Sequence, residues 1–140
     1  MRVVIDTSVL VAAVRSRQGA SFALVRSIPD PRFEPCLAVG LYTEWQEVLT
    51  RKENIPAGRT PDDAKRFLHY LASQCHLQEI HFLWRPFLPD ADDDMVLELA
   101  FAAGCRYIIT HNVRDFGGSE RLGVRPISPR DFLNLIRSEA

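Results

Sequence analysis

The sequence predicts an α/β fold of three layers, α/β/α, around a central, mainly parallel sheet of four or five strands. Short runs rich in β-branched residues, such as residues 2–5 and 107–110, alternate along the chain with longer segments of helical periodicity. Strands that alternate with helices favour right-handed crossovers, which cover both faces of a parallel sheet with helices. The length of 140 residues is typical of one domain, so we expect a single domain over residues 1–140.

The first half of the chain is expected to run strand, helix, helix, strand, helix. Residues 2–5 are a continuous apolar run, as expected for a strand that is buried on both faces. Helical periodicity follows up to Gly19 and again over 22–28, where prolines close the second helix. Residues 33–37 are too short for a helix and are expected to form a second strand. The next helix has one apolar face, formed by Leu41, Trp45, Val48 and Leu49.

A polar loop is expected over 51–59, followed by a helix over 61–74. Thr60 is a good N-cap, and the proline after it suits the first position of a helix. Beyond that helix, residues 78–83 are expected to form an irregular or edge strand.

The last third of the chain contains an acidic run and the clearest remaining strand. Residues 90–94 hold four acids in five positions, directly before an almost entirely apolar helix over 95–103, which must be buried. Residues 107–110 are a third clear strand and 124–127 a weak edge strand. A final helix is expected from Pro129.

Composition limits the class of protein without choosing a function. Hydrophobic residues make up 46% and charged residues 25%, as in an ordinary globular protein. No apolar run approaches the roughly 18 residues of a membrane helix, and Asp6 interrupts the opening apolar stretch, so we expect a cytoplasmic protein with no membrane contact. Cys36, Cys75 and Cys105 lack metal-site spacing and are expected to be buried small hydrophobic residues.

Charge and acid placement point to a cation. In open parallel sheets the functional crevice lies beyond the carboxyl ends of the strands. Asp6 ends the first strand, residues 110–115 follow the third, and Asp93 opens the helix that leads into the third. Carboxylates that share a crevice repel one another unless cations compensate, and Mg²⁺ or Mn²⁺ held by carboxylates and substrate phosphate is the natural arrangement. This favours phosphodiester chemistry.

Each acid taken alone also has a simpler explanation. Asp6 could be the N-cap of the following helix, and residues 90–94 could be a solvated turn whose charges favour a helix N-terminus. Glu44 and Glu47 could be surface charges. A phospho-accepting or phosphatase domain with Asp6 as nucleophile fits less well, because the chain has no D-x-D motif there and no lysine after the third strand.

Four blocks in order resemble the PIN-domain ribonucleases, close to the VapC-type toxins of toxin-antitoxin pairs. They are RVVIDTSVL, GLYTEWQEVL, DADDDMVLELAFAAGCRYIIT and HNVRDF, and together they span nearly the whole chain. The resemblance implies a PIN-like fold and a metal-dependent endoribonuclease that uses Mg²⁺ or Mn²⁺ to hydrolyse RNA. A rival interpretation is a catalytically weak PIN-like module that binds RNA or a protein partner.

Carried over by position, the resemblance makes Asp6 the first acid, Glu44 the second and Asp93 the third, with Glu47 as the weaker choice for the second. Asp92 and Asp94 are then neighbours that could support the third acid from outside. The supporting hydroxyls fall on Ser8 and Thr110.

The fourth acid departs from the family pattern. Many relatives have Asp two residues after the threonine of the third strand, where this chain has Asn112, and the next acid is Asp115. We expect Asp115 to complete the catalytic set, with Asp6 and Asp93 as its companions in holding the metal. The arginines expected to grip RNA are Arg15, Arg17 and Arg114.

The resemblance also implies protein partners. Such toxins commonly form homodimers and are blocked by a protein antitoxin laid across the active-site groove. Trp84, Phe87 and Leu88 are candidates for an exposed apolar contact surface, and the alternative is that they pack on the domain's own core.

Overall fold

The sheet has five strands, all parallel, in the computed structural model, which describes residues 1–81 and 86–138. Its order is β3-β2-β1-β4-β5, and β1 pairs with β2 on one side and β4 on the other. The strands are β1 (Arg2–Ile5), β2 (Glu34–Leu37), β3 (His76–Leu77), β4 (Tyr107–Ile109) and β5 (Arg125–Ile127). The predicted three-layer α/β/α fold is confirmed.

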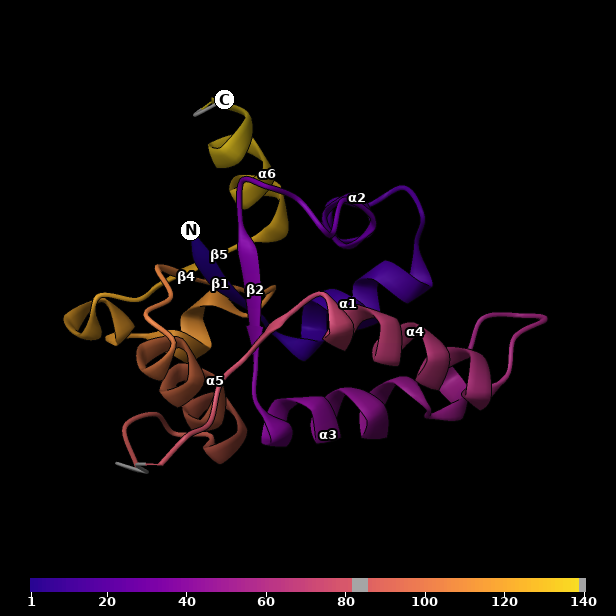
Figure 1. Ribbon diagram of the computed structural model, residues 1–140, viewed down its shortest axis with the longest axis horizontal. Helices are drawn as coiled ribbons and strands as arrows, with labels where there is room; N and C mark the ends of the chain where they lie inside the picture. The colour runs from indigo at the N-terminus through magenta and orange to yellow at the C-terminus, as the bar shows by residue number, and fades with distance from the viewer. Residues whose placement is uncertain (82–85, 139–140) are drawn as a thin grey trace.

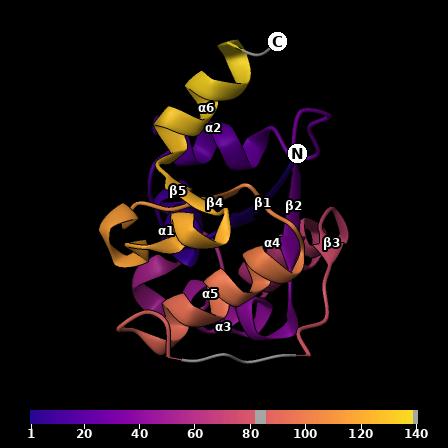
Figure 2. The same ribbon diagram turned by 90° about the vertical axis from the view of Figure 1, so that its left-hand side faces the viewer.

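Helices cover both faces of this sheet. They are α1 (Thr7–Arg15), α2 (Ala20–Arg26), α3 (Val39–Leu49), α4 (Pro61–Ser73), α5 (Ala91–Ala102) and α6 (Pro129–Ser138), with short 3₁₀ turns η1 (Lys52–Asn54), η2 (Val113–Phe116) and η3 (Ser119–Leu122). Figure 2 shows α5 on the opposite side of β1 and β4 from α2 and α6. In Figure 1, α3 and α4 lie side by side and project away from the strands.

The strand order sets the place of the functional crevice. The chain moves outward from β1 to β2 to β3, and then crosses back through α5 to β4 on the other side of β1. The direction of winding therefore reverses between β1 and β4, and such a switch point opens a crevice at the carboxyl ends of the two strands. Asp6 and Thr110 follow directly at those ends.

The edge strand lies earlier than predicted. It is His76–Leu77, paired with Cys36 and Leu37, and not residues 78–83. The Gln78 N–H still donates to the Leu37 carbonyl at 2.8 Å, but β2 ends at Leu37 and pairing stops there. The end of β3 is set by the end of its neighbour β2. The residues of β3 alone do not indicate where this pairing stops. Residues 82 and 83 of the predicted strand lie outside the described residues.

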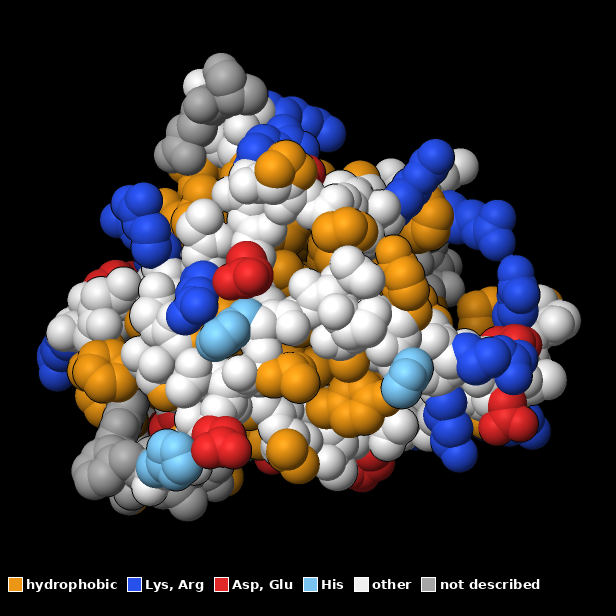
Figure 3. Space-filling model, in the orientation of Figure 1, with side chains coloured by type: hydrophobic (Ala, Val, Ile, Leu, Met, Phe, Trp, Pro, Cys, Tyr) orange, Lys and Arg blue, Asp and Glu red, His pale blue; other side chains and the backbone are white. Residues whose placement is uncertain are grey.

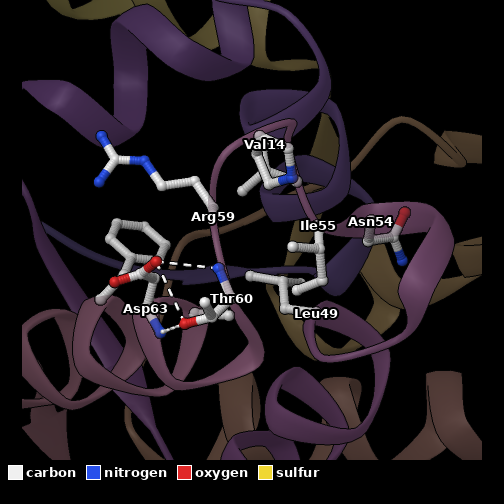
Figure 4. A pocket seen from close by; sticks show the side chains of 10 residues that line it. Val14, Leu49, Asn54, Ile55, Arg59, Thr60 and Asp63 are labelled. Atoms are coloured by element: carbon white, nitrogen blue, oxygen red, sulfur yellow. Dashed lines mark hydrogen bonds between the residues drawn. The ribbon is translucent and has the colours of Figure 1, made fainter.

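The predicted N-cap of α4 is confirmed, and the prediction of buried cysteines holds for Cys36 and Cys105 but not for Cys75. Thr60 and Asp63 form a reciprocal capping box at the start of α4 (Figure 4). Cys36 and Cys105 are buried and Cys75 is half-buried, all as free thiols. Along the described chain, no helix has the length and apolar character to cross a membrane.

Candidate active site

Asp6 occupies the N-cap position of α1, but its carboxylate bonds to side-chain hydroxyls and does not cap the helix. Within the described structure it makes no capping hydrogen bond to α1. Instead Oδ2 accepts from Ser8 Oγ at 2.9 Å and from Thr110 Oγ1 at 2.7 Å, and the side chain is only slightly exposed. Two hydroxyls, one from the first turn of α1 and one directly after β4, thus fix this carboxylate at the switch point, so helix capping does not explain Asp6.

Glu44 reaches the same place from α3. Thr7 Oγ1, in the first turn of α1, donates to Glu44 Oε2 at 2.5 Å. Burial raises the pKa of Glu44, with added repulsion from the carboxylates of Asp6, Asp92 and Asp90, while the Thr7 hydrogen bond opposes the rise. A surface charge would not experience these neighbours, so the surface interpretation of Glu44 is wrong.

Glu47, the weaker choice for the second acid, lies outside the crevice. Its side chain is 70% exposed and pairs at 3.5 Å with Nη2 of Arg51, four residues later and just past the end of α3. Glu47 and Arg51 form an ordinary helix-surface ion pair.

Asp93, in the first turn of α5, has the most strongly shifted pKa among these acids. Its pKa is raised to about 7, first by burial and then by the carboxylates of Asp90, Asp6, Asp115 and Glu44. These influences come from four separate segments of the chain. The acids therefore surround one region beyond the carboxyl ends of β1 and β4.

A cavity of about 330 Å³ opens beside Asp93. Its lining residues are Pro89, Asp90, Asp93, Arg114, Asp115 and Gly117. Asp115 and Arg114, both in η2, thus lie next to the third acid. Asn112 precedes η2, and its backbone N–H donates to Thr110 Oγ1 at 2.9 Å.

Asp90 is a site residue that the sequence analysis did not single out. It is the N-cap of α5, where Oδ1 accepts from the Asp92 N–H at 2.7 Å, and it is the carboxylate that raises the pKa of Asp93 most. The available signal was its place as the first acid of the run at 90–94. His111 was also missed: its Nε2 lies 2.7 Å from Ser21 Oγ, and its backbone N–H donates to Ser8.

Asp94 has a structural role, which corrects the expectation that it supports the crevice. Its buried carboxylate accepts from the backbone N–H of Leu88 at 2.7 Å and of Phe87 at 3.2 Å. Leu88 is itself buried, so it is not available for an exposed contact surface, whereas Phe87 is 38% exposed. Trp84, the third member of that surface, lies outside the described residues.

The three arginines expected to grip RNA are widely separated. Arg114 lines the cavity beside Asp93. Arg15 ends α1, eight residues and thus ~12 Å of helix beyond Thr7 at the crevice, and its Nε and Nη2 donate to Asn54 Oδ1 at 3.1 and 2.8 Å. Arg17 follows α1 and is exposed. The expectation that Arg15 and Arg17 flank the crevice is therefore wrong, because α1 carries them away from it.

Comparison with known proteins fits this arrangement. The family model described as PIN domain matches residues 2–114, which include Asp6, Glu44, Asp93 and Asn112 but stop one residue before Asp115. The chain belongs to the PIN domain family. A comparison with curated protein sequences gives no match.

Two solved structures share the fold of this PIN domain at low sequence identity. VapBC-1 from nontypeable Haemophilus influenzae has a TM-score of 0.63 at 15% identity and covers 93% of this chain and 99% of its own. VapBC2 from Rickettsia felis, bound to a DNA fragment from the promoter, has a TM-score of 0.62 at 11% identity. This match covers 90% of this chain and 98% of the VapBC2 chain.

The donor set of this PIN domain suits a hard divalent cation. All the charged donors are carboxylates; the pKa of Asp93 and of Glu44 is raised first by burial and then by repulsion from the other acids. Among residues 1–81 and 86–138, no three acidic, histidine or cysteine side chains are close enough together to hold an ion as they stand. Mg²⁺ needs only one or two carboxylates and keeps several waters, so this spacing is compatible with it.

Proposed function

We propose that this PIN domain is a metal-dependent endoribonuclease that hydrolyses RNA phosphodiester bonds with Mg²⁺ or Mn²⁺. The observation that carries the proposal is the group of acids from β1, α3 and α5 at the switch point, with the pKa of Asp93 raised to about 7. A fold gains nothing from such repulsion on its own, whereas a cation and a phosphate would relieve it.

In this mechanism each side chain has a definite task. An ion shared by Asp6, Asp93 and Asp115, with part of this set reaching it through bound waters, would lower the pKa of one water and offset charge on the phosphate. Ser8 and Thr110 keep Asp6 in one orientation. Glu44, whose pKa is raised, accepts the proton of the attacking water as its oxygen bonds to phosphorus and the ribose oxygen leaves.

Cleavage assays test this proposal. Purified protein is incubated with end-labelled total RNA in Mg²⁺, Mn²⁺ or EDTA, with Asp6→Asn as the inactive control. We expect internal cuts with either ion, none with EDTA, and at least ~100-fold slower cutting by Asp6→Asn. Cutting that persists in EDTA would refute the mechanism. RNA binding without cutting in either ion would favour the rival, a catalytically weak RNA-binding module, which the presence of Asn112 supports.

Asp115 supplies the fourth carboxylate in this proposal, while Asn112 orients water or a neighbouring acid. Asp115 lines the cavity with Asp93 and contributes to its raised pKa. We expect Asp115→Asn to weaken Mn²⁺ binding and slow cleavage, since each carboxylate removed takes away charge that offsets the ion's lost hydration. If Asp115→Asn is silent while Asn112→Asp tightens Mn²⁺, the fourth position belongs to Asn112.

We further propose that the protein acts in the cytoplasm as the toxin of a toxin-antitoxin pair, blocked by a protein antitoxin, and that it forms a homodimer. The support is the shared fold with two VapBC proteins. Induced expression in a bacterial host should arrest growth, and Asp6→Asn should not. Light scattering at micromolar concentration tests the dimer, and a monomer would refute it.

A further inference from the structure

Positive charge gathers at the far end of the α3–α4 pair, away from the acidic crevice. Residues 51–66 hold five Lys or Arg against three Asp or Glu, and residues 7–29 hold three Arg and no acid. Figure 3 shows Lys and Arg side chains grouped at the right-hand end of the molecule, where Figure 1 places this end of α3 and α4.

We call four exposed side chains there the basic tip. Its members are Arg17, Lys52, Arg59 and Lys65. Their neighbours Arg51 and Arg66 are paired with Glu47 and Asp63, whereas no ion pair found within the described residues involves the four members of the tip. The charge of the tip is therefore available to a ligand.

A small pocket of about 210 Å³ opens beside Arg59, one member of the basic tip. Figure 4 shows Val14, Leu49 and Ile55 facing one another, with the Arg59 side chain at the rim. Pro56, Ala64 and Phe67 add to the apolar lining. The pocket is smaller than the roughly 300 Å³ at which sites for drug-sized ligands begin, so it suits a single ring.

The polar groups around this pocket are already engaged. Asn54 accepts from Arg15 and donates to the Val48 carbonyl at 2.8 Å, and Thr60 and Asp63 bond to each other in the capping box. What remains for a ligand is an apolar surface beside a guanidinium. A positive surface with apolar or aromatic platforms is how proteins hold single-stranded nucleic acid.

The crevice and the basic tip lie at opposite ends of helices α1 and α3. Thr7 bonds to Glu44 at the crevice end, and Arg15 bonds to Asn54 at the tip end, so α1 and α3 run side by side between them. The eight-residue step from Thr7 to Arg15 is ~12 Å of helix.

We propose that the basic tip binds the RNA substrate on one side of the cleaved bond, with backbone phosphates on its cations and one base in the pocket of Val14 and Phe67. This rests on the proposed ribonuclease function. The acidic crevice repels a polyanion and the chain's net charge is −1, so a substrate must be held by local positive charge elsewhere. Arginine, which supplies two members of the tip, forms bidentate bonds to phosphate.

Binding without cleavage tests the proposal. The probe is a fluorescein-labelled 12-nucleotide oligouridylate, measured by anisotropy in EDTA at several KCl concentrations. The tip variant is Lys52→Gln with Arg59→Gln, and the matched control is Arg121→Gln with Arg137→Gln, two exposed arginines of η3 and α6. We expect the tip variant to bind at least ~10-fold more weakly, with a salt slope smaller by about 1.4, and the control to stay within about twofold of wild type.

The pocket is tested by removing bases from the probe. Wild type should bind oligouridylate about fivefold or more tighter than an abasic 12-mer, and Ile55→Gln, which places a polar group in the pocket, should lose that preference. Equal affinity of wild type for the two probes would overturn the base-binding claim. Melting curves of each variant confirm that it is folded.

Two further outcomes would overturn the phosphate claim. If the tip variant binds RNA like wild type, the basic tip is not an RNA surface. If a labelled oligoglutamate of equal charge binds wild type as tightly as RNA does, the tip fits an acidic protein instead. Because binding is measured in EDTA, these results are independent of cleavage: tip binding can fail while metal-dependent cutting stands, and the reverse.

Discussion

Asp93→Asn should stabilise the protein at neutral and alkaline pH when no divalent ion is present. Burial and four neighbouring carboxylates raise the pKa of Asp93 from 3.8 to about 7. The folded state therefore holds a proton that the unfolded chain has released, and the wild-type free energy of unfolding falls as pH rises from about 4 to about 7. Asparagine cannot ionise, so its variant avoids this loss.

The expected gain in the free energy of unfolding follows from the shift in the pKa of Asp93. A rise from 3.8 to about 7 corresponds to about 4 kcal/mol without solvent screening. Asp93 is partly exposed, so screening reduces the figure to ~1–2 kcal/mol. The variant also loses a negative charge in the first turn of α5, which costs ~0.5 kcal/mol. We expect a net gain of about 1 kcal/mol.

Urea unfolding in EDTA at pH 8 and pH 4.5 measures this difference. The gain should be full at pH 8 and mostly absent at pH 4.5. Asp62→Asn, the same change in the first turn of α4, is the control and should be slightly destabilising at pH 8. Asp93→Asn that is no more stable than wild type at pH 8, or equally stabilised at both pH values, would refute the crowding argument.

Three further predictions separate site residues from structural ones. Glu44→Gln should slow RNA cleavage at least ~100-fold while Glu47→Gln stays within about twofold, as measured by initial rates in Mn²⁺. Asn54→Ala should lower the free energy of unfolding in urea by about 2 kcal/mol, because it removes bonds to Arg15 and to the Val48 carbonyl. Asp94→Ala should cost ~2–3 kcal/mol in the same assay, since it leaves backbone N–H groups before α5 without their acceptor, and a smaller loss would contradict its structural role.

The parts of the site that follow from topology were predictable from the sequence. Asp6 and Thr110 each end a buried strand, and in a parallel sheet with a reversal of winding such ends meet at one edge. Glu44 was different, because helical periodicity placed it only one position off an apolar face. Choosing it over Glu47 required the resemblance to a family, and the reason is visible only in space, where Thr7 bonds to Glu44.

Side-chain partners from distant segments were not predictable. Arg15, which was expected to grip RNA, bonds to Asn54, 39 positions away, and no pattern in either segment indicates the pairing. The edge strand was misplaced for the same reason, since its limits are set by Leu37 of the neighbouring strand. Such errors arise wherever a residue's role is decided by a tertiary neighbour and not by its own segment.

The acidic run at 90–94 shows how much depends on where one helix begins. The apolar pattern begins only at Met95, but α5 already starts at Ala91. Asp92, Asp93 and Asp94 therefore lie in the first turn of the helix and point in directions about 100° apart. Asp93 faces the crevice while Asp94, one position later, faces the preceding loop and binds its N–H groups. If α5 were rotated about its axis by the angle between two successive residues, a different acid of its first turn would face the crevice. The rotation of α5, and not the number of acids, therefore decides which carboxylate can reach the substrate.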